Sequence, residues 1–199
     1  ADTSSTRTPY PDAEARSEGV RYADGFVLGS EQGHRVVDVV RPWRGAEAAF
    51  RYVLVPRGEE PPPDVGDAQV VFTPVRSLVV LSTTHLGFID ALGLTDRVVG
   101  VSGADWIYSP DVRNRVAAGE VVDVGPPGTV DLEHVLGLGA DLVMVSSLGD
   151  PSDLHARLSR LGQPVAVNAE YAEASPLGRA LARFPMAPAC IRIYQPAKT

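Results

Sequence analysis

Five short apolar segments recur along the 199-residue chain at a spacing of roughly twenty residues. They cover residues 78–81, 98–101, 121–124, 142–145 and 165–167. Between them lie segments with helically spaced apolar residues, at 86–92, 110–118, 131–138 and 152–161. Asp131 and Ser152 suit helix N-caps, and glycines follow three of these segments. This alternation predicts an α/β fold with a mostly parallel, Rossmann-like sheet covered by helices on both faces.

The region before residue 76 has a different pattern. Residues 25–31, 35–40 and 50–56 are typical of strands, and the turn at 31–34 favours an antiparallel β-hairpin. A proline-rich connection, residues 56–67, follows. We therefore expect an amino-terminal hairpin region over residues 19–75, packed on an α/β lobe over residues 76–175. The polar residues 1–18 suit a disordered segment or the remnant of a tether.

Composition excludes several classes of function. A net charge of −7 argues against nucleic-acid binding, because neutralising phosphates requires clustered Lys and Arg. No stretch approaches the roughly 18 consecutive apolar residues that span a bilayer. The chain starts with a polar run and not a signal peptide, which suits a processed or trimmed form. A single cysteine, Cys190, excludes an intramolecular disulfide.

Common enzyme motifs are absent. No Gly-x-Gly-x-x-Gly or Gly-x-x-x-x-Gly-Lys-Ser/Thr sequence follows a strand, so the usual nucleotide-phosphate loops are missing. Around Ser102, residues 100–104 fall one position short of a Gly-x-Ser-x-Gly nucleophile elbow. His-x-x-x-His and Cys-x-x-Cys spacings are also missing. We expect no enzymatic activity and no cofactor.

The polar turn after the first apolar strand is the strongest candidate for a binding site. Ser82, Thr83, Thr84 and His85 separate the strand from the following helix. Hydroxyls, an imidazole and the backbone N–H groups of a helix N-terminus suit carboxylate, phosphate or hydroxamate oxygens. The alternative is a simple helix cap. His85 as a direct metal ligand is less favoured, because one imidazole needs partners, and the metal-binding residues are left open.

Two further groups follow other strands of the predicted sheet. Asp105, Trp106 and Tyr108 offer aromatic faces with polar edges for a macrocycle or aromatic chelate, or else pack on the rim. The turn at 125–128 (GPPG) is expected to shape the cleft. Asn168, Glu170 and Tyr171 follow the last strand and either face a ligand or pack at a hinge.

The order of these segments resembles the class III periplasmic substrate-binding proteins of ABC importers, which handle iron-siderophores, haem and cobalamin. The resemblance covers roughly residues 22–179. It rests on 22–26 (YADGF), 52–58 (YVLVPRG), the STTH opening with 91–93 (ALG), 96–102 (DRVVGVS), 105–108 (DWIY), 131–136 (DLEHVL), 140–145 (ADLVMV) and 162–168 (GQPVAVN).

This resemblance implies a receptor that captures a ligand and delivers it to an ABC permease. An iron-siderophore is the favoured ligand, and cobalamin and haem are the less favoured ones. It implies export to the periplasm or cell surface, with a possible lipid anchor. Acidic residues of such receptors dock on permease arginines, and Asp150 and Asp153 stand at the matching place, although the usual residue is Glu. The residues listed above at the strand ends would line the ligand cleft.

The end of the chain departs from the family pattern. A long helix and a second lobe would be expected after the last strand. Residues 176–180 suit the start of that helix, but residues 184–199 contain three prolines, which a helix interior does not accommodate. We expect a truncated single lobe with an aberrant tail, and a natural single-lobe product is the alternative. A small α/β enzyme or nucleotide-binding domain, and a scaffold that binds no ligand, remain as competing hypotheses.

Overall fold

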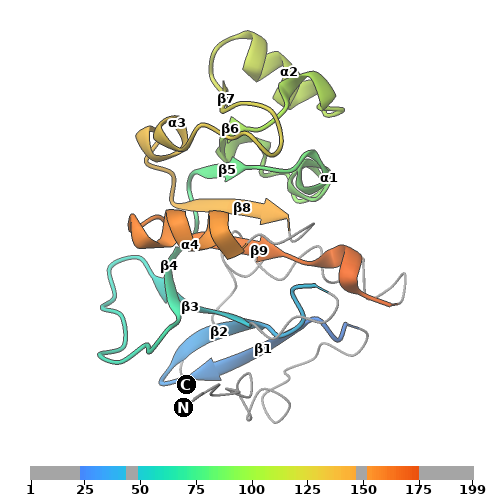
Figure 1. The fold of residues 1–199 in the computed structure, drawn as a ribbon. Coiled ribbons are helices and arrows are strands. Elements are labelled where there is room, and N and C mark those ends of the chain that lie inside the picture. The colour runs from blue at the N-terminus through green and yellow to red at the C-terminus, as the bar shows by residue number, and fades with distance from the viewer. Residues whose placement is uncertain (1–22, 44–48, 147–151, 175–199) are drawn as a thin grey trace, which may run out of the picture.

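The computed structural model describes residues 23–43, 49–146 and 152–174, which form two sheets and their flanking helices (Figure 1). The first sheet has the strand order β1-β2-β3-β4. Its strands are β1 (Phe26–Glu31), β2 (His34–Val39), β3 (Phe50–Pro56) and β4 (Gln69–Thr73). The predicted hairpin is confirmed, with β1 antiparallel to β2 around a two-residue turn at Gln32 and Gly33, both at positive φ. Strand β4, parallel to β3, was not predicted.

The second sheet is parallel throughout and has the order β7-β6-β5-β8-β9. Its strands are β5 (Leu78–Val80), β6 (Val98–Val101), β7 (Val122–Asp123), β8 (Leu142–Ser146) and β9 (Val165–Asn168). The helices are α1 (Thr83–Ala91), α2 (Pro110–Ala117), α3 (Leu132–Gly137) and α4 (Ser152–Arg160), with 3₁₀ turns η2 (Thr95–Arg97), η3 (Ala104–Trp106) and η4 (Glu170–Ala172). Each predicted strand and helix of this region is present. No helix within the described ranges has both the length and the apolar character to cross a bilayer.

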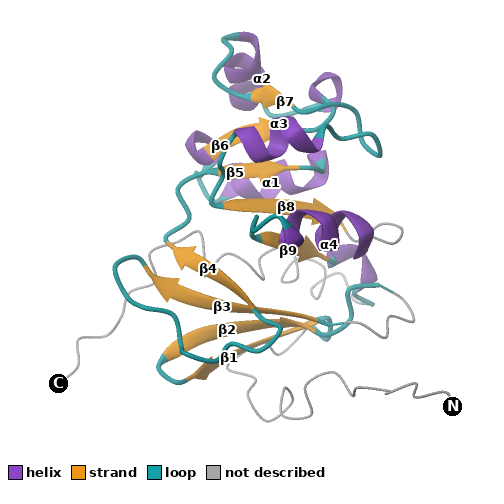
Figure 2. Ribbon diagram, turned by 60° about the vertical axis from the view of Figure 1, so that its left-hand side comes forward, coloured by secondary structure: helices purple, strands orange, loops and turns teal. Residues whose placement is uncertain are grey.

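Side chains alternate between the two faces of the parallel sheet, and each face has its own core. Figure 2 shows α1 on one side of this sheet and α3 and α4 on the other. Leu78 and Val80 pack with Leu86 and Ile89 of α1 and with Val112 of α2. On the other face, Val79 and Val143 pack with Val135 of α3 and Leu158 of α4. The predicted α/β architecture with helices on both faces is therefore confirmed.

Two side chains of the first sheet join it to the edge of the second. The Tyr52 hydroxyl accepts a hydrogen bond from the Val167 N–H at 2.9 Å, and the Gln69 side-chain oxygen accepts one from the Val165 N–H at 2.7 Å. Tyr52 and Gln69 are register partners on β3 and β4. They therefore satisfy alternate outward N–H groups of β9, the type of exposed edge that would otherwise attract another strand.

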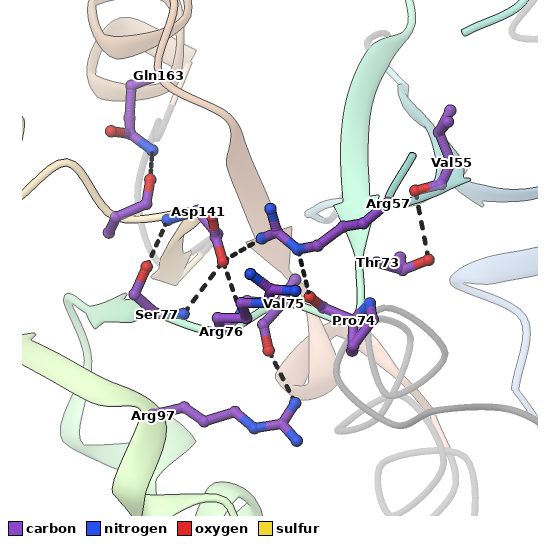
Figure 3. Close-up of polar contacts among 11 residues, drawn as sticks. Val55, Arg57, Thr73, Pro74, Val75, Arg76, Ser77, Arg97, Asp141 and Gln163 are labelled. Carbon is purple, nitrogen blue, oxygen red and sulfur yellow. Dashed lines mark hydrogen bonds and ion pairs between the residues drawn. The ribbon is translucent and has the colours of Figure 1, made fainter. Parts of the chain in front are cut away.

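A second junction lies at the amino ends of β5 and β8 (Figure 3). The Asp141 carboxylate forms an ion pair with Arg57 and accepts the N–H groups of Arg76 at 2.6 Å and Ser77 at 3.3 Å. Arg57 also donates to the Pro74 carbonyl at 3.0 Å. Burial would raise the Asp141 pKa, but Arg57 and the two N–H groups outweigh it and hold the pKa below its usual 3.8.

We expect Asp141→Asn to lower the free energy of unfolding by about 1 to 3 kcal/mol at pH 7, because it weakens hydrogen bonds made to a charged group. The stabilisation from a lowered carboxyl pKa is present above 3.8 and is lost as the pH falls through the folded-state value. Urea denaturation should thus show a difference from wild type that shrinks toward pH 3. Asp96→Asn, which changes an exposed carboxylate, is the control. Equal stabilities at pH 7 would contradict this role for Asp141.

Candidate functional site

The order of the parallel sheet defines where its carboxyl edge opens. From β5 the chain adds β6 and β7 on one side and then returns to add β8 and β9 on the other. The helices that follow β5 and β8, α1 and α4, pack on opposite faces of the sheet, and open α/β sheets bind ligands in the crevice at such a switch point. In Figure 1 the arrows of β5 and β8 point toward the same side of the molecule, next to α1. Ser82–His85 follow β5 at this position, with the buried Leu81 between them and the strand.

The first turn of α1 is polar and has no acidic residue. Ser82 is the N-cap but makes no side-chain capping hydrogen bond. Its hydroxyl is instead 2.9 Å from the Thr84 hydroxyl, and the two are hydrogen bonded. Ser82 and Thr83 are half-buried and Thr84 is exposed. The positive end of the helix dipole and the three hydroxyls, each at least partly accessible, suit an anionic oxygen here.

His85 lies differently from its three neighbours. Its side chain is fully buried, and its ring centroid is 6.1 Å from that of Phe88. Among the described residues, neither ring nitrogen has a hydrogen-bond partner. Burial lowers the pKa of His85 to about 4, so the imidazole is neutral at pH 7. The ring therefore packs on the inner face of α1, whereas the three hydroxyls lie at the accessible edge.

The loop after β6 presents two exposed aromatic side chains. Trp106 is 60% exposed and Tyr108 is 92% exposed, while Ile107 between them is buried and anchors the loop. Asp105 is exposed as well. Gly103 begins the η3 turn with a φ of 74°, a left-handed conformation that favours glycine. The loop thus directs large apolar surfaces into solvent at the same edge of the sheet.

Asp123 at the end of β7, which sequence reasoning missed, ties this loop to the next one. Its carboxylate accepts N–H groups from Gly103 at 3.3 Å, Ala104 at 3.2 Å and Gly125 at 3.1 Å. The Gly103 N–H also donates to the Gly125 carbonyl at 3.1 Å. An aspartate two residues before a glycine is a common turn signal, so the sequence contained a clue to the local bond but not to the bonds across strands.

The third predicted group lies at the end of β9, beyond β8 from the Ser82 turn. Asn168 is buried, and its oxygen accepts the Glu170 N–H at 3.2 Å. Glu170 and Tyr171 are half-buried in η4. The Glu173 carboxylate accepts the N–H groups of Asp24 at 3.1 Å and Gly25 at 2.6 Å, and so fixes η4 to the start of the first sheet.

Other predictions fall outside these groups. Asp150 lies outside the described residues, as do the segments 1–18 and 176–199; Asp153 lies on α4, in its first turn. Within the described ranges, no group of three or more His, Cys, Asp or Glu side chains could hold a metal ion. A cavity of about 320 Å³ adjoins Val36, Val53, Asp64 and Asp67. It belongs to the first sheet and its β3–β4 loop, and none of the predicted residues line it.

Comparison with known proteins gives partial matches. No family model matches the chain. It is 25% identical over 162 residues to an uncharacterized lipoprotein of Methanocaldococcus jannaschii, which covers 71% of this chain and 39% of that protein. A shorter match, 32% identical over 80 residues, is to the 7-cyano-7-deazaguanine synthase of Paramagnetospirillum magneticum, covering 40% of this chain and 35% of the synthase.

Similar solved structures include the periplasmic heme-binding protein RhuT of Roseiflexus sp. RS-1, with 21% identity, a TM-score of 0.45, and coverage of 58% of this chain and 42% of that one. The petrobactin-binding protein YclQ of Bacillus subtilis has 17% identity and a TM-score of 0.42, with coverage of 78% and 45%. Each of these matches covers only part of the chain. The chain spans less than half the length of these four relatives.

Proposed function

We propose that this chain is a ligand-binding lobe of the solute-binding receptor of an ABC importer, and that it captures an iron-siderophore or a related metal chelate. The observation that carries the proposal is the placement of the Ser82–Thr84 turn at the switch point between β5 and β8. The segment pattern of the sequence supports the same function.

The chemistry of the edge suits such a ligand. Thr84 and its neighbouring hydroxyls, at a helix N-terminus without acidic residues, favour carboxylate or hydroxamate oxygens. Trp106 and Tyr108 supply exposed apolar surface for the bulk of a chelate. Asp105, on the same loop, and Asn168, Glu170 and Tyr171, at the end of β9, complete the proposed lining, with His85 supporting α1 from its buried side.

The proposal extends to the setting of the receptor. Delivery of the chelate would require an ABC permease, for which Asp150 and Asp153 are the proposed docking residues. Asp153 lies in the first turn of α4, where the helix dipole by itself also stabilises a carboxylate. A periplasmic or cell-surface location, with a possible lipid anchor, follows from the same proposal.

The test is a titration of intrinsic tryptophan fluorescence with a ferric siderophore, cobalamin, haem and free Fe(III). The chain has two tryptophans, so a Trp43→Phe background leaves Trp106 as the reporter. We expect saturable quenching by an iron chelate, because Trp106 is exposed at the proposed edge. Replacing Trp106 instead of Trp43 should abolish the response, after correction for ligand absorbance.

Competition between a nucleotide and the chelate distinguishes the proposed function from the alternatives. A nucleotide that displaces the chelate with its phosphates at Thr83 and Thr84 would favour the nucleotide-binding alternative. A folded protein that shows no quenching with any of these probes, at concentrations up to the millimolar range that marks weak binding, would contradict ligand capture by this chain. Thr84→Ala should weaken chelate binding without a loss of stability, because Thr84 is exposed.

A further inference from the structure

We infer that Asp123 is a positioning residue that holds the Trp106 loop in a preformed orientation for the ligand, an inference that rests on the proposed function. Asp123 is exposed at the end of the two-residue strand β7. Its carboxylate is bonded to backbone N–H groups of the two neighbouring loops, so the role inferred for it needs no direct contact with the ligand. It acts on that edge through the backbone of two neighbouring loops.

The geometry gives Asp123 control of both loops. One carboxylate oxygen accepts the Gly103 and Gly125 N–H groups, and the other accepts the Ala104 N–H. Gly103 precedes η3 and Ala104 is its first residue, so these bonds fix the turn that carries Trp106. The Ser102 hydroxyl adds a bond to the Gly125 carbonyl at 2.8 Å, which joins the same two loops from the buried side.

The ring of Trp106 depends on this junction. A Cβ placed on Gly103 would lie 3.3 Å from Cε3 of Trp106 and 3.1 Å from Cδ of Pro127. The indole and the proline ring therefore both lie close to the Gly103 backbone, one from each loop. Because Trp106 still exposes 60% of its surface, the junction presents the indole without covering it. An anchored aromatic side chain loses less conformational entropy when a ligand binds.

A carboxylate suits this position better than an amide. Three N–H donors converge on Asp123, and both oxygens of an ionised Asp accept hydrogen bonds. An Asn side chain would keep one acceptor and turn an NH₂ group toward a backbone N–H. We therefore expect Asp123→Ala to have a larger effect than Asp123→Asn, and both to loosen the loop.

The experiment uses the full chain in the Trp43→Phe background and measures time-resolved fluorescence anisotropy of Trp106 without ligand. Asp123→Ala should increase the amplitude of local indole motion, Asp123→Asn should increase it less, and the unfolding midpoint should change little because β7 is an exposed edge strand. Asp111→Asn removes another exposed carboxylate, from α2, and serves as the matched control. Where wild type binds a chelate, the affinity of Asp123→Ala should fall about tenfold.

The outcomes separate this inference from the proposed function. Unchanged indole motion in Asp123→Ala would overturn the positioning role, whatever the ligand titration shows. If Asp123→Ala shows increased indole motion but the parent protein with an intact Asp123 binds no chelate, the positioning role is supported and the proposed function is contradicted. A large fall in the unfolding midpoint of Asp123→Ala would show that Asp123 is a general structural residue, which also overturns the inference. If Asp123→Ala is too unstable to measure, the milder Asp123→Asn variant allows indole motion and stability to be compared.

Discussion

Replacing Tyr52 by phenylalanine should lower the free energy of unfolding by about 1 to 3 kcal/mol, the cost of a buried donor left without its acceptor. The Tyr52 side chain is fully buried, and its hydroxyl accepts the Val167 N–H of the edge strand β9. Tyr52→Ala should cost about 3 to 5 kcal/mol, because it also leaves a cavity where both sheets share a core. Urea denaturation followed by circular dichroism measures both changes.

The pH dependence of the same variant provides an independent check. Burial raises the pKa of Tyr52 above its usual value of 10.0, and the Val167 N–H lowers it only in part. The folded state therefore resists ionisation, and the stability that Tyr52 contributes below pH 10 declines as the pH rises further. Tyr52→Phe should lose this alkaline sensitivity. Tyr108→Phe, at a 92% exposed position, should match wild type throughout. A Tyr52→Phe protein as stable as wild type at neutral pH would contradict the edge-capping role.

The sequence predicted the parallel sheet well because its strands are short, apolar and regularly spaced. Such strands need only local information: two buried faces give continuous apolar runs, as in residues 142–145, and glycines end the helices between them. Strand β4 was missed for a corresponding reason. Gln69 begins it after a proline-rich loop, and its parallel pairing with β3 is a nonlocal property. The bond from the Val165 N–H to Gln69 spans 96 residues of sequence, which no local pattern indicates.

The candidate site was predictable in its location more than in its details. Polar residues at strand ends marked the Ser82 turn and the Trp106 loop, because strand ends set the carboxyl edge of a parallel sheet. The burial of His85 had a signal in the helical spacing, since Phe88 and Ile89 lie three and four residues farther on the same face. The role of Asp123 had almost none, because two of its three N–H partners come from a loop about twenty residues earlier.

His85 should make the protein sensitive to mild acid. Its imidazole is fully buried, and burial lowers its pKa from 6.5 to about 4. Between these values the unfolded chain takes up a proton that the folded chain does not, so the free energy of unfolding falls with the pH. The full change is about 3 kcal/mol. The free energy of unfolding keeps its full value above pH 6.5 and has lost the His85 contribution once the pH falls to about 4.

His85→Leu should remove most of this slope, because leucine fills a similar volume without a titratable group. At pH 5 the variant should be more stable than wild type, since an uncompensated buried polar ring is replaced by an apolar side chain. His155, where burial also lowers the pKa to about 4, should leave a residual slope that is smaller than that of the fully buried His85, because its ring is only partly buried. The exposed His134 gives the control, and His134→Gln should follow the wild-type curve. Urea denaturation from pH 7.5 to 4 measures all three proteins, and a His85→Leu curve parallel to wild type would show that the acid sensitivity arises elsewhere.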